Sequence, residues 1–140
     1  MIYVRRNIVE TLMRDAREPV ETGYLLIGRL SGDLYCDELV QKKEGTRRRV
    51  DVGNTQSIIM DLDDRGLLGE GMDKKVVPGW AHTHLSPDGH LMFSKRDRRT
   101  QRDFQSDFPE SVAIVGSSTG VAVWRKESGV YRAVEYGVIE

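Results

Sequence analysis

One segment constrains the fold of this chain more than any other: residues 20–30, with the sequence VETGYLLIGRL. The near-continuous apolar run at its centre predicts a buried β-strand. The turn signal Ser31-Gly32-Asp33 follows at once, so residues 34–40 are expected to return as the second strand of a hairpin. The core is therefore expected to form around a β-sheet that contains this hairpin.

Helices and further strands are expected on both sides of the hairpin. Apolar residues recur at helical spacing through residues 5–17 and Pro19 follows, which predicts an N-terminal helix. Helices are also expected from residue 54 or 55 to residue 69 or 71 and at residues 94–107, and strands at 75–83, 111–116, 120–125 and 130–136. This order of helices and strands indicates an α/β sandwich around a mixed sheet.

The composition limits the class of protein. A chain of 140 residues suggests a single domain, residues 1–140, and 39% hydrophobic with 31% charged residues is typical of a soluble globular protein. A net charge of −1 argues against binding to nucleic acid. No apolar run approaches the roughly 20 residues of a membrane span, and the N-terminus does not resemble a signal peptide. The single cysteine, Cys36, is expected to be a small buried hydrophobe, and the cytoplasm is the expected location.

The segment most informative about function is His82-Thr83-His84, followed by Ser94-Lys95-Arg96-Asp97. Residues i and i+2 of a strand point to the same side, so His82 and His84 can present two imidazoles to one metal ion. Asp97 lies in the first turn of the predicted helix, where its carboxylate can reach the same point. Zinc suits imidazole and carboxylate ligands, and a catalytic zinc site keeps a fourth position for water.

Hydrolysis at such a site needs a general base. A zinc ion lowers the pKa of its bound water to about 7, and a nearby side chain must then take up the proton and pass it to the leaving amine. Glu21 is the candidate base, because it stands at the start of the predicted buried strand. Gly23 lies beside it and leaves room for a substrate or another backbone.

In these residues the chain resembles the JAMM metalloproteases, also called MPN-plus domains, which include deubiquitinases and prokaryotic relatives. The family pattern is a glutamate near the first strand, then H-x-H, a loop and S-x-x-D. Those roles fall here on Glu21, His82, His84, Ser94 and Asp97. The phrase ETGYLLIG, residues 21–28, is similar to the family's E-x-G-G-x-L-x-G strand, and SVAIV, residues 111–115, also fits.

The resemblance implies the MPN fold, which is a cytidine-deaminase-like α/β sandwich with a mixed, curved sheet flanked by helices. It also implies one zinc ion per chain and hydrolysis of a peptide or isopeptide bond at the C-terminus of a ubiquitin-like protein. In that comparison His82, His84 and Asp97 hold the zinc, Glu21 is the general base, and the hydroxyl of Ser94 stabilises the oxyanion.

Two departures from the family pattern leave alternatives open. Nine residues separate His84 from Ser94, two more than is usual in the family, and Leu85 replaces the usual proline. With a longer loop, Asp88 or His90 is an alternative ligand. Ser94 and Asp97 also form a capping-box-like start of a helix, so either can have a purely structural role.

Three functions therefore compete. The first is the metallopeptidase or isopeptidase, the second is processing of a sulfur-carrier protein with the ubiquitin fold, and the third is an MPN scaffold without catalysis. The sequence leaves the oligomeric state open. Trp80 is expected in the core or at its rim, and Arg47-Arg48-Arg49 on a solvated face.

Overall fold

A computed structural model describes residues 1–46, 55–71, 74–85 and 91–140. The strands are β1 (Ile2–Arg5), β2 (Thr22–Ser31), β3 (Asp33–Glu44), β4 (Val76–Thr83), β5 (Val112–Ser117), β6 (Gly120–Glu127), β7 (Val130–Val134) and β8 (Gly137–Ile139). The helices are α1 (Arg6–Asp15), α2 (Thr55–Asp64) and α3 (Lys95–Asp107). Within the described residues, no helix has both the length and the apolar character needed to cross a bilayer.

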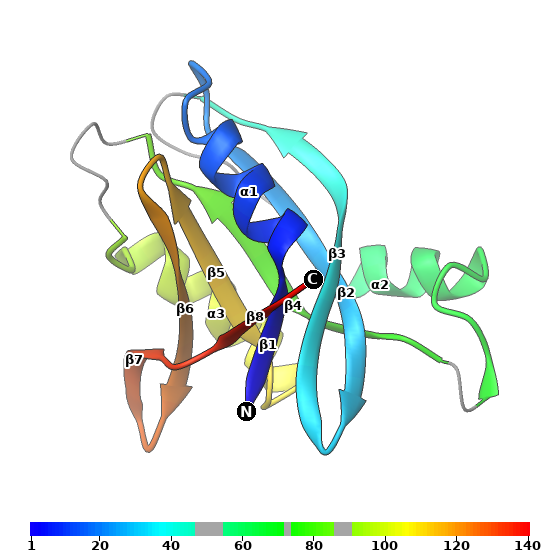
Figure 1. Cartoon of the computed structure of the whole chain (residues 1–140). Coiled ribbons are helices and arrows are strands. Elements are labelled where there is room, and N and C mark those ends of the chain that lie inside the picture. Colours follow the sequence, from blue (N-terminus) through cyan, green and yellow to red (C-terminus); the bar gives the residue numbers. More distant parts are fainter. Residues whose placement is uncertain (47–54, 72–73, 86–90) are drawn as a thin grey trace.

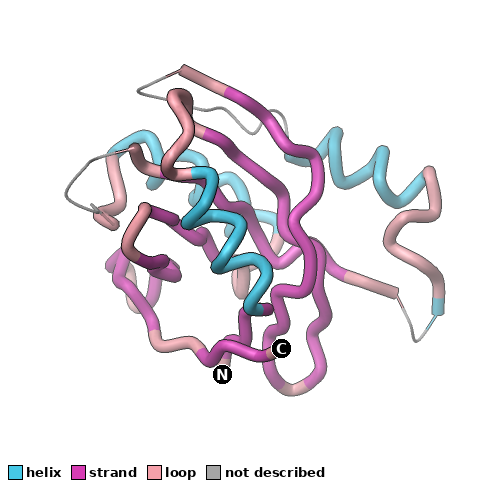
Figure 2. Tube along the Cα trace, turned by 45° about the horizontal axis from the view of Figure 1, so that its top comes forward, coloured by secondary structure: helices cyan, strands magenta, loops and turns pink. Residues whose placement is uncertain are grey.

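The strands form one mixed sheet in the order β7-β6-β5-β4-β2-β3-β1-β8. Three pairs are parallel, β1 with β3, β1 with β8 and β4 with β5, and the other pairs are antiparallel. The expected hairpin forms the β2–β3 pair, and it closes at Gly32, whose φ of 73° is one that glycine adopts without strain. Figures 1 and 2 show this sheet with α1 across one face and α3 on the other.

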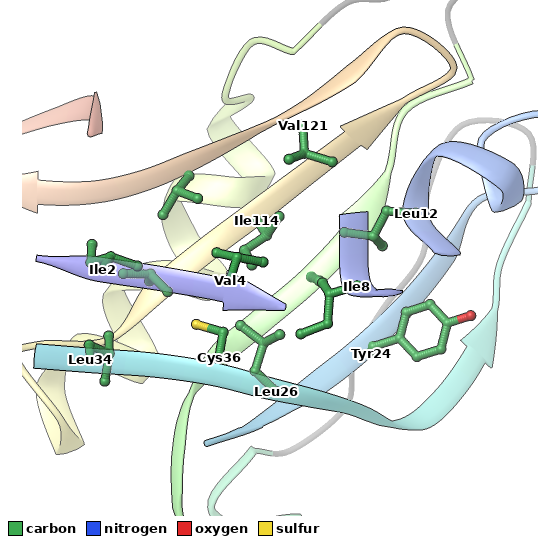
Figure 3. Close-up of a cluster of buried hydrophobic side chains, with 13 residues drawn as sticks. Ile2, Val4, Ile8, Leu12, Tyr24, Leu26, Leu34, Cys36, Ile114 and Val121 are labelled. Atoms are coloured by element: carbon green, nitrogen blue, oxygen red, sulfur yellow. The ribbon is translucent and has the colours of Figure 1, made fainter. Parts of the chain in front are cut away.

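Each face of the sheet has its own hydrophobic cluster. The first packs beneath α1 and includes Ile8, Leu12, Leu26 and Ile114, as Figure 3 shows. The second includes Leu62 of α2 and Phe104 of α3 and packs against the opposite face. Because β2 contributes to both clusters, its run of apolar residues needs no polar alternation.

The fold class expected from the sequence is confirmed as an α/β sandwich around a mixed sheet. The element bounds differ in places. No element was predicted for residues 2–4 and Arg5 was expected to begin the helix, but residues 2–5 form β1 because they pair with Leu34–Cys36 of β3, a long-range contact that local pattern does not reveal. Helices α1 and α2 are shorter than expected and end at Asp15 and Asp64, and residues 137–139 form the separate strand β8.

Packing explains two local features of the sheet. Only glycine fits at position 79 of β4, because a Cβ there would lie 1.7 Å from the carbonyl oxygen of Val112 in β5. Cys36 is fully buried in the cluster under α1, and burial raises the pKa of its thiol to about 12. It therefore packs as a neutral side chain and is not a nucleophile.

Candidate metal centre

The two histidines come from the end of β4, on the face of the sheet that α3 covers. Trp80 belongs to the cluster on that face, and strand alternation places His82 on the same side. The Trp80 and His82 rings stack with centroids 4.6 Å apart. His84 follows the last strand residue, and its Nε2 lies 3.0 Å from Nε2 of His82. Gly23 pairs directly opposite His82, so no β2 side chain occupies the space beside the imidazole.

The third member, Asp97, is held by the start of α3. Ser94 is the N-cap, and its Oγ accepts the backbone N–H of Asp97 at 3.1 Å. The Asp97 carboxylate in turn accepts the backbone N–H of Ser94 at 2.9 Å, which completes a capping box. This reciprocal pair fixes the carboxylate, which is buried against the histidines. Asp97 is therefore a capping residue and a member of the cluster at once.

The spacing of the donor atoms suits a tetrahedral zinc ion. Nε2 of His82 lies 3.0 Å from Oδ1 of Asp97, and Nε2 of His84 lies 3.4 Å from Oδ2. Ligand atoms at tetrahedral corners, with bonds of about 2.0–2.1 Å, stand about 3.3 Å apart. The potential ligand atoms of the three residues all lie within 4.8 Å of one another, so this group can hold a metal ion.

The protonation states also suit a cation. Burial lowers the pKa of His82 and outweighs the opposing effect of Asp97, so the imidazole is neutral at pH 7. Burial acts to raise the pKa of Asp97, but hydrogen bonds from His82 and His84 hold it well below its usual range. A neutral imidazole and an ionised carboxylate are the forms that bind zinc. Nδ1 of His82 is buried and has no hydrogen-bond partner among the described residues.

Glu21 reaches this centre through the register of the sheet. It immediately precedes β2, and its backbone pairs with the residues that follow β3, with its N–H 2.8 Å from the carbonyl oxygen of Thr46. The side chain is 8% exposed. Burial raises the pKa of its carboxyl to about 7, with Asp97 raising it further and His84 and Arg96 lowering it. The fold therefore gathers Glu21, His82, His84 and Asp97 in one place.

Ser94 is exposed at the rim of this centre. Its oxygen accepts a hydrogen bond as the N-cap, but its hydroxyl proton remains available to a ligand. The structural role expected for Ser94 is thus observed, and it leaves the oxyanion role possible. The alternative ligands Asp88 and His90, and the basic run 47–49, lie outside the described residues.

Sequence reasoning missed the support behind His82. Gln101 is fully buried in α3, one helical turn after Asp97. Its Oε1 accepts the indole N–H of Trp80 at 2.8 Å, and its Nε2 donates to the carbonyl oxygen of Ser111 at 2.8 Å. Gln101 therefore fixes the orientation of the Trp80 indole, against which the His82 ring stacks. A polar residue four positions after Asp97, on the same helix face, was the signal available in the sequence.

The fold and this donor set agree with the resemblance to the JAMM/MPN-plus family that the sequence motifs indicate. Over its whole length the chain is homologous to part of STAM-binding protein. The rat and mouse proteins are each 29% identical to it over 145 aligned residues, which cover 99% of this chain and 31% of the relative. The STAM-binding protein-like protein of Xenopus laevis is 24% identical over the same share. The chain thus spans about a third of the length of these curated relatives.

A solved structure has the same fold. The solution structure of a Desulfitobacterium hafniense protein superposes with a TM-score of 0.69 over 100% of this chain and 94% of that chain, at 17% identity. No protein-family model matches the chain. The homology to STAM-binding protein bears out the resemblance seen in the sequence, and the solved structure bears out the fold.

Proposed function

We propose that this chain is a zinc-dependent hydrolase of peptide or isopeptide bonds. The observation on which this depends is the convergence of His82, His84 and Asp97 donor atoms beside the buried carboxylate of Glu21. Homology to STAM-binding protein supports the proposal, as does the resemblance of the whole motif to JAMM metalloproteases. His82, His84 and Asp97 would hold one zinc ion per chain.

A bound zinc ion would supply a Lewis acid that polarises a carbonyl group and lowers the pKa of a coordinated water. Glu21 is the group that would move the proton. Burial raises the pKa of its carboxyl to about 7 in the metal-free protein, and the charge of a bound zinc ion would lower it, so Glu21 would be ionised at neutral pH and could accept a proton from the attacking water and release it to the leaving amine. Its burial next to the cluster keeps bulk water from competing for that proton.

Ser94 would stabilise the charge that develops on the scissile carbonyl oxygen. Its position at the N-terminus of α3 places it beside backbone N–H groups that are not paired within the helix. A hydroxyl that donates to an oxyanion typically contributes about 3–4 kcal/mol to the transition state. Asp97 holds the main chain of Ser94 through the capping box, so the hydroxyl is positioned before the substrate binds.

The substrate we propose is the C-terminal tail of a ubiquitin-like protein, joined to a lysine side chain or to a linear extension. The family resemblance supports this choice. A sulfur-carrier protein of the same fold is a variant of the same substrate class, and a panel of both kinds of tail separates the two.

The test begins with the metal. Elemental analysis of the purified protein should find about one zinc per chain, and Glu21→Gln should keep it, because Glu21 is not a ligand. His84→Ala should lose it. A wild-type chain that takes up no added zinc would instead be a scaffold.

Turnover is then measured by mass spectrometry on three probes: ubiquitin linked through its C-terminal glycine to a lysine-containing peptide, the same ubiquitin with a linear extension, and a ubiquitin-fold sulfur carrier with a linear extension. We expect the zinc-loaded wild type to cut at least one of them, and Glu21→Gln to cut none. Equal turnover by Glu21→Gln would remove Glu21 from the mechanism, and cleavage of the sulfur carrier alone would favour the second function.

A further inference from the structure

A buried polar cluster lies directly behind the proposed metal centre, on the face of the sheet that α1 covers. It consists of Asp15 at the end of α1, Thr22 and Tyr24 in β2, and Thr83 in β4, with exposed fractions of 3%, 2%, 6% and 0%. Figure 3 shows Tyr24 at the margin of the apolar cluster, with its hydroxyl oxygen turned away from the neighbouring aliphatic side chains. The proposed function uses none of these four side chains.

The four side chains are connected by hydrogen bonds. The Tyr24 hydroxyl donates to Oδ2 of Asp15, and the hydroxyl of Thr22 donates to the same oxygen at 3.5 Å. The backbone N–H of Thr22 donates to Oγ1 of Thr83 at 2.9 Å, and the two threonine hydroxyl oxygens are 3.4 Å apart. Buried polar groups are costly without partners, so this cluster acts as a unit that links α1, β2 and β4.

The bond between Thr22 and Thr83 sits where backbone pairing between β2 and β4 stops. The backbone register of that pair ends at Gly23 opposite His82. If the same register continued by one residue, Thr22 would lie opposite Thr83, and if it continued by two, Glu21 would lie opposite His84. At Thr22 the hydroxyl oxygen of Thr83 accepts the backbone N–H in place of a backbone carbonyl. It therefore extends the contact between the strands toward Glu21.

The metal-ligand strand is held independently on its other side. His82 is in register with Val115 of β5, and the backbone N–H of His84 donates to the carbonyl oxygen of Gly116 at 2.8 Å. Glu21 is held to the residues that follow β3 by its backbone bonds with residues 45 and 46. The hydrogen bonds between Thr22 and Thr83 therefore tie the Glu21 end of β2 to β4 beyond the last backbone pair.

We propose that Thr83 is a positioning residue, which holds the backbone beside Glu21 so that this carboxylate stays opposite His84. Thr22 and, behind it, Asp15 and Tyr24 orient the two hydroxyls. This role rests on the proposed hydrolase function. It predicts that loss of the Thr83 hydroxyl displaces the base while the zinc ligands stay in place.

The first experiment uses the metal-free protein and no substrate. Thr83→Val keeps the shape of the side chain and removes the acceptor, so the Thr22 amide should exchange its hydrogen at least about ten times faster by NMR. Thr83→Ser restores the hydroxyl and should restore the protection. Tyr24→Phe removes only the bond to Asp15, and it should accelerate exchange at Thr22 less. It also serves as the second variant if Thr83→Val does not fold.

The second experiment measures zinc content and the kinetics of the best-cleaved ubiquitin-fold probe. For Thr83→Val we expect about one zinc per chain, a KM within two-fold of the wild type, and a kcat at least about ten-fold lower, since small displacements of a catalytic group have effects of this size. Thr83→Ser should recover kcat. Tyr136→Phe is the matched control, because the hydroxyl bond that it removes joins Tyr136 to the Val121 carbonyl and not to a member of the polar cluster, so kcat should stay unchanged.

The outcomes separate the two proposals. Unchanged Thr22 exchange in Thr83→Val, or a kcat that falls equally in Thr83→Ser, overturns the positioning role while the hydrolase proposal stands. If the wild type neither binds zinc nor cuts any probe, the hydrolase proposal fails. The exchange measurement then still decides whether Thr83 holds the strand end.

Discussion

Glu21→Gln in the metal-free protein tests how deeply the candidate base is buried. Glu21 is 8% exposed as a residue, and the pKa of its carboxyl rises from an ordinary 4.5 to about 7, mainly because burial penalises its charged form. Glutamine has nearly the same shape and cannot ionise. The difference in unfolding free energy between the two proteins therefore isolates the cost of charging this one group.

The direction in which the unfolding free energy changes with pH follows from the number of protons that each state binds. Between pH 4.5 and 7 the folded wild type holds a proton on Glu21 that the unfolded chain has released, so stability falls as the pH rises through this window. Below pH 4.5 both states are protonated and the penalty disappears. Above pH 7 the penalty is complete, and the rise from 4.5 to about 7 corresponds to at most about 3 kcal/mol. For a chain of this size that is roughly 10 °C in Tm.

The assay is urea unfolding and thermal melting at pH 4, 5, 6, 7 and 8 with a chelator present. We expect the unfolding free energy of Glu21→Gln to exceed that of the wild type by an amount that grows from pH 5 to pH 8. At pH 4, where the wild-type carboxyl is protonated in both states, the difference should be smallest. Glu18→Gln, a change at an exposed carboxylate three residues away, should stay within about 0.5 kcal/mol of the wild type throughout. A stability difference between the wild type and the Glu21→Gln variant that does not vary with pH would refute the buried, charge-penalised state of Glu21.

Three further predictions concern the centre and its support. Zinc at a hundred-fold excess over its Kd should stabilise the wild type by about 2.7 kcal/mol in thermal melts, and His84→Ala should abolish this gain. In the metal-free wild type, the stability contributed by the low pKa of Asp97 should be lost as the pH falls below about 4, and Asp97→Asn should flatten this acid limb in urea titrations. Gln101→Leu should cost about 2–4 kcal/mol in urea unfolding, because it leaves the Trp80 indole N–H and the Ser111 carbonyl buried and unpaired, whereas Gln105→Leu, at a half-buried residue whose hydrogen bonds are exposed to water, should cost less.

The sequence predicted those parts of the fold that depend on local pattern. The hairpin at Gly32, helix α3 with its capping box, and the strand that contains His82 all follow from residues close together in the chain. Strand β1 was missed because its four residues are ordered by pairing with β3, more than 30 residues away. The bounds of α1 and α2 were too long for a similar reason, since packing decides where a helix ends.

The candidate site divides in the same way. His82 and His84 follow from strand alternation, and Asp97 from its place in the first helical turn. Glu21 was named as candidate base from its place at the start of the predicted strand, and the family resemblance joined it to the histidines, because its distance from His82 in the chain gives no local signal. The sheet supplies the physical reason, since continuing the β2–β4 register brings Glu21 opposite His84. Thr83 had no pattern of its own, and for Gln101 the only signal was its place four positions after Asp97, so their buried hydrogen bonds are what reveal both roles.

Hydrophobic alternation alone does not fix which residues of β2 pair with which residues of β4. A strand with one polar face resists slipping, because a slip of one residue would turn its polar side chains into the core. The centre of β2 is apolar on both faces, so Leu25 and Leu26 could exchange faces with little penalty from hydrophobicity alone. The polar cluster removes this freedom: in a slipped register Asp15 would stay buried without the hydroxyls of Thr22 and Tyr24, at a cost of several kcal/mol. The residues that hold Glu21 opposite His84 are therefore the same ones that select the strand register, and changes at Thr22 or Thr83 should affect folding specificity and the candidate site together.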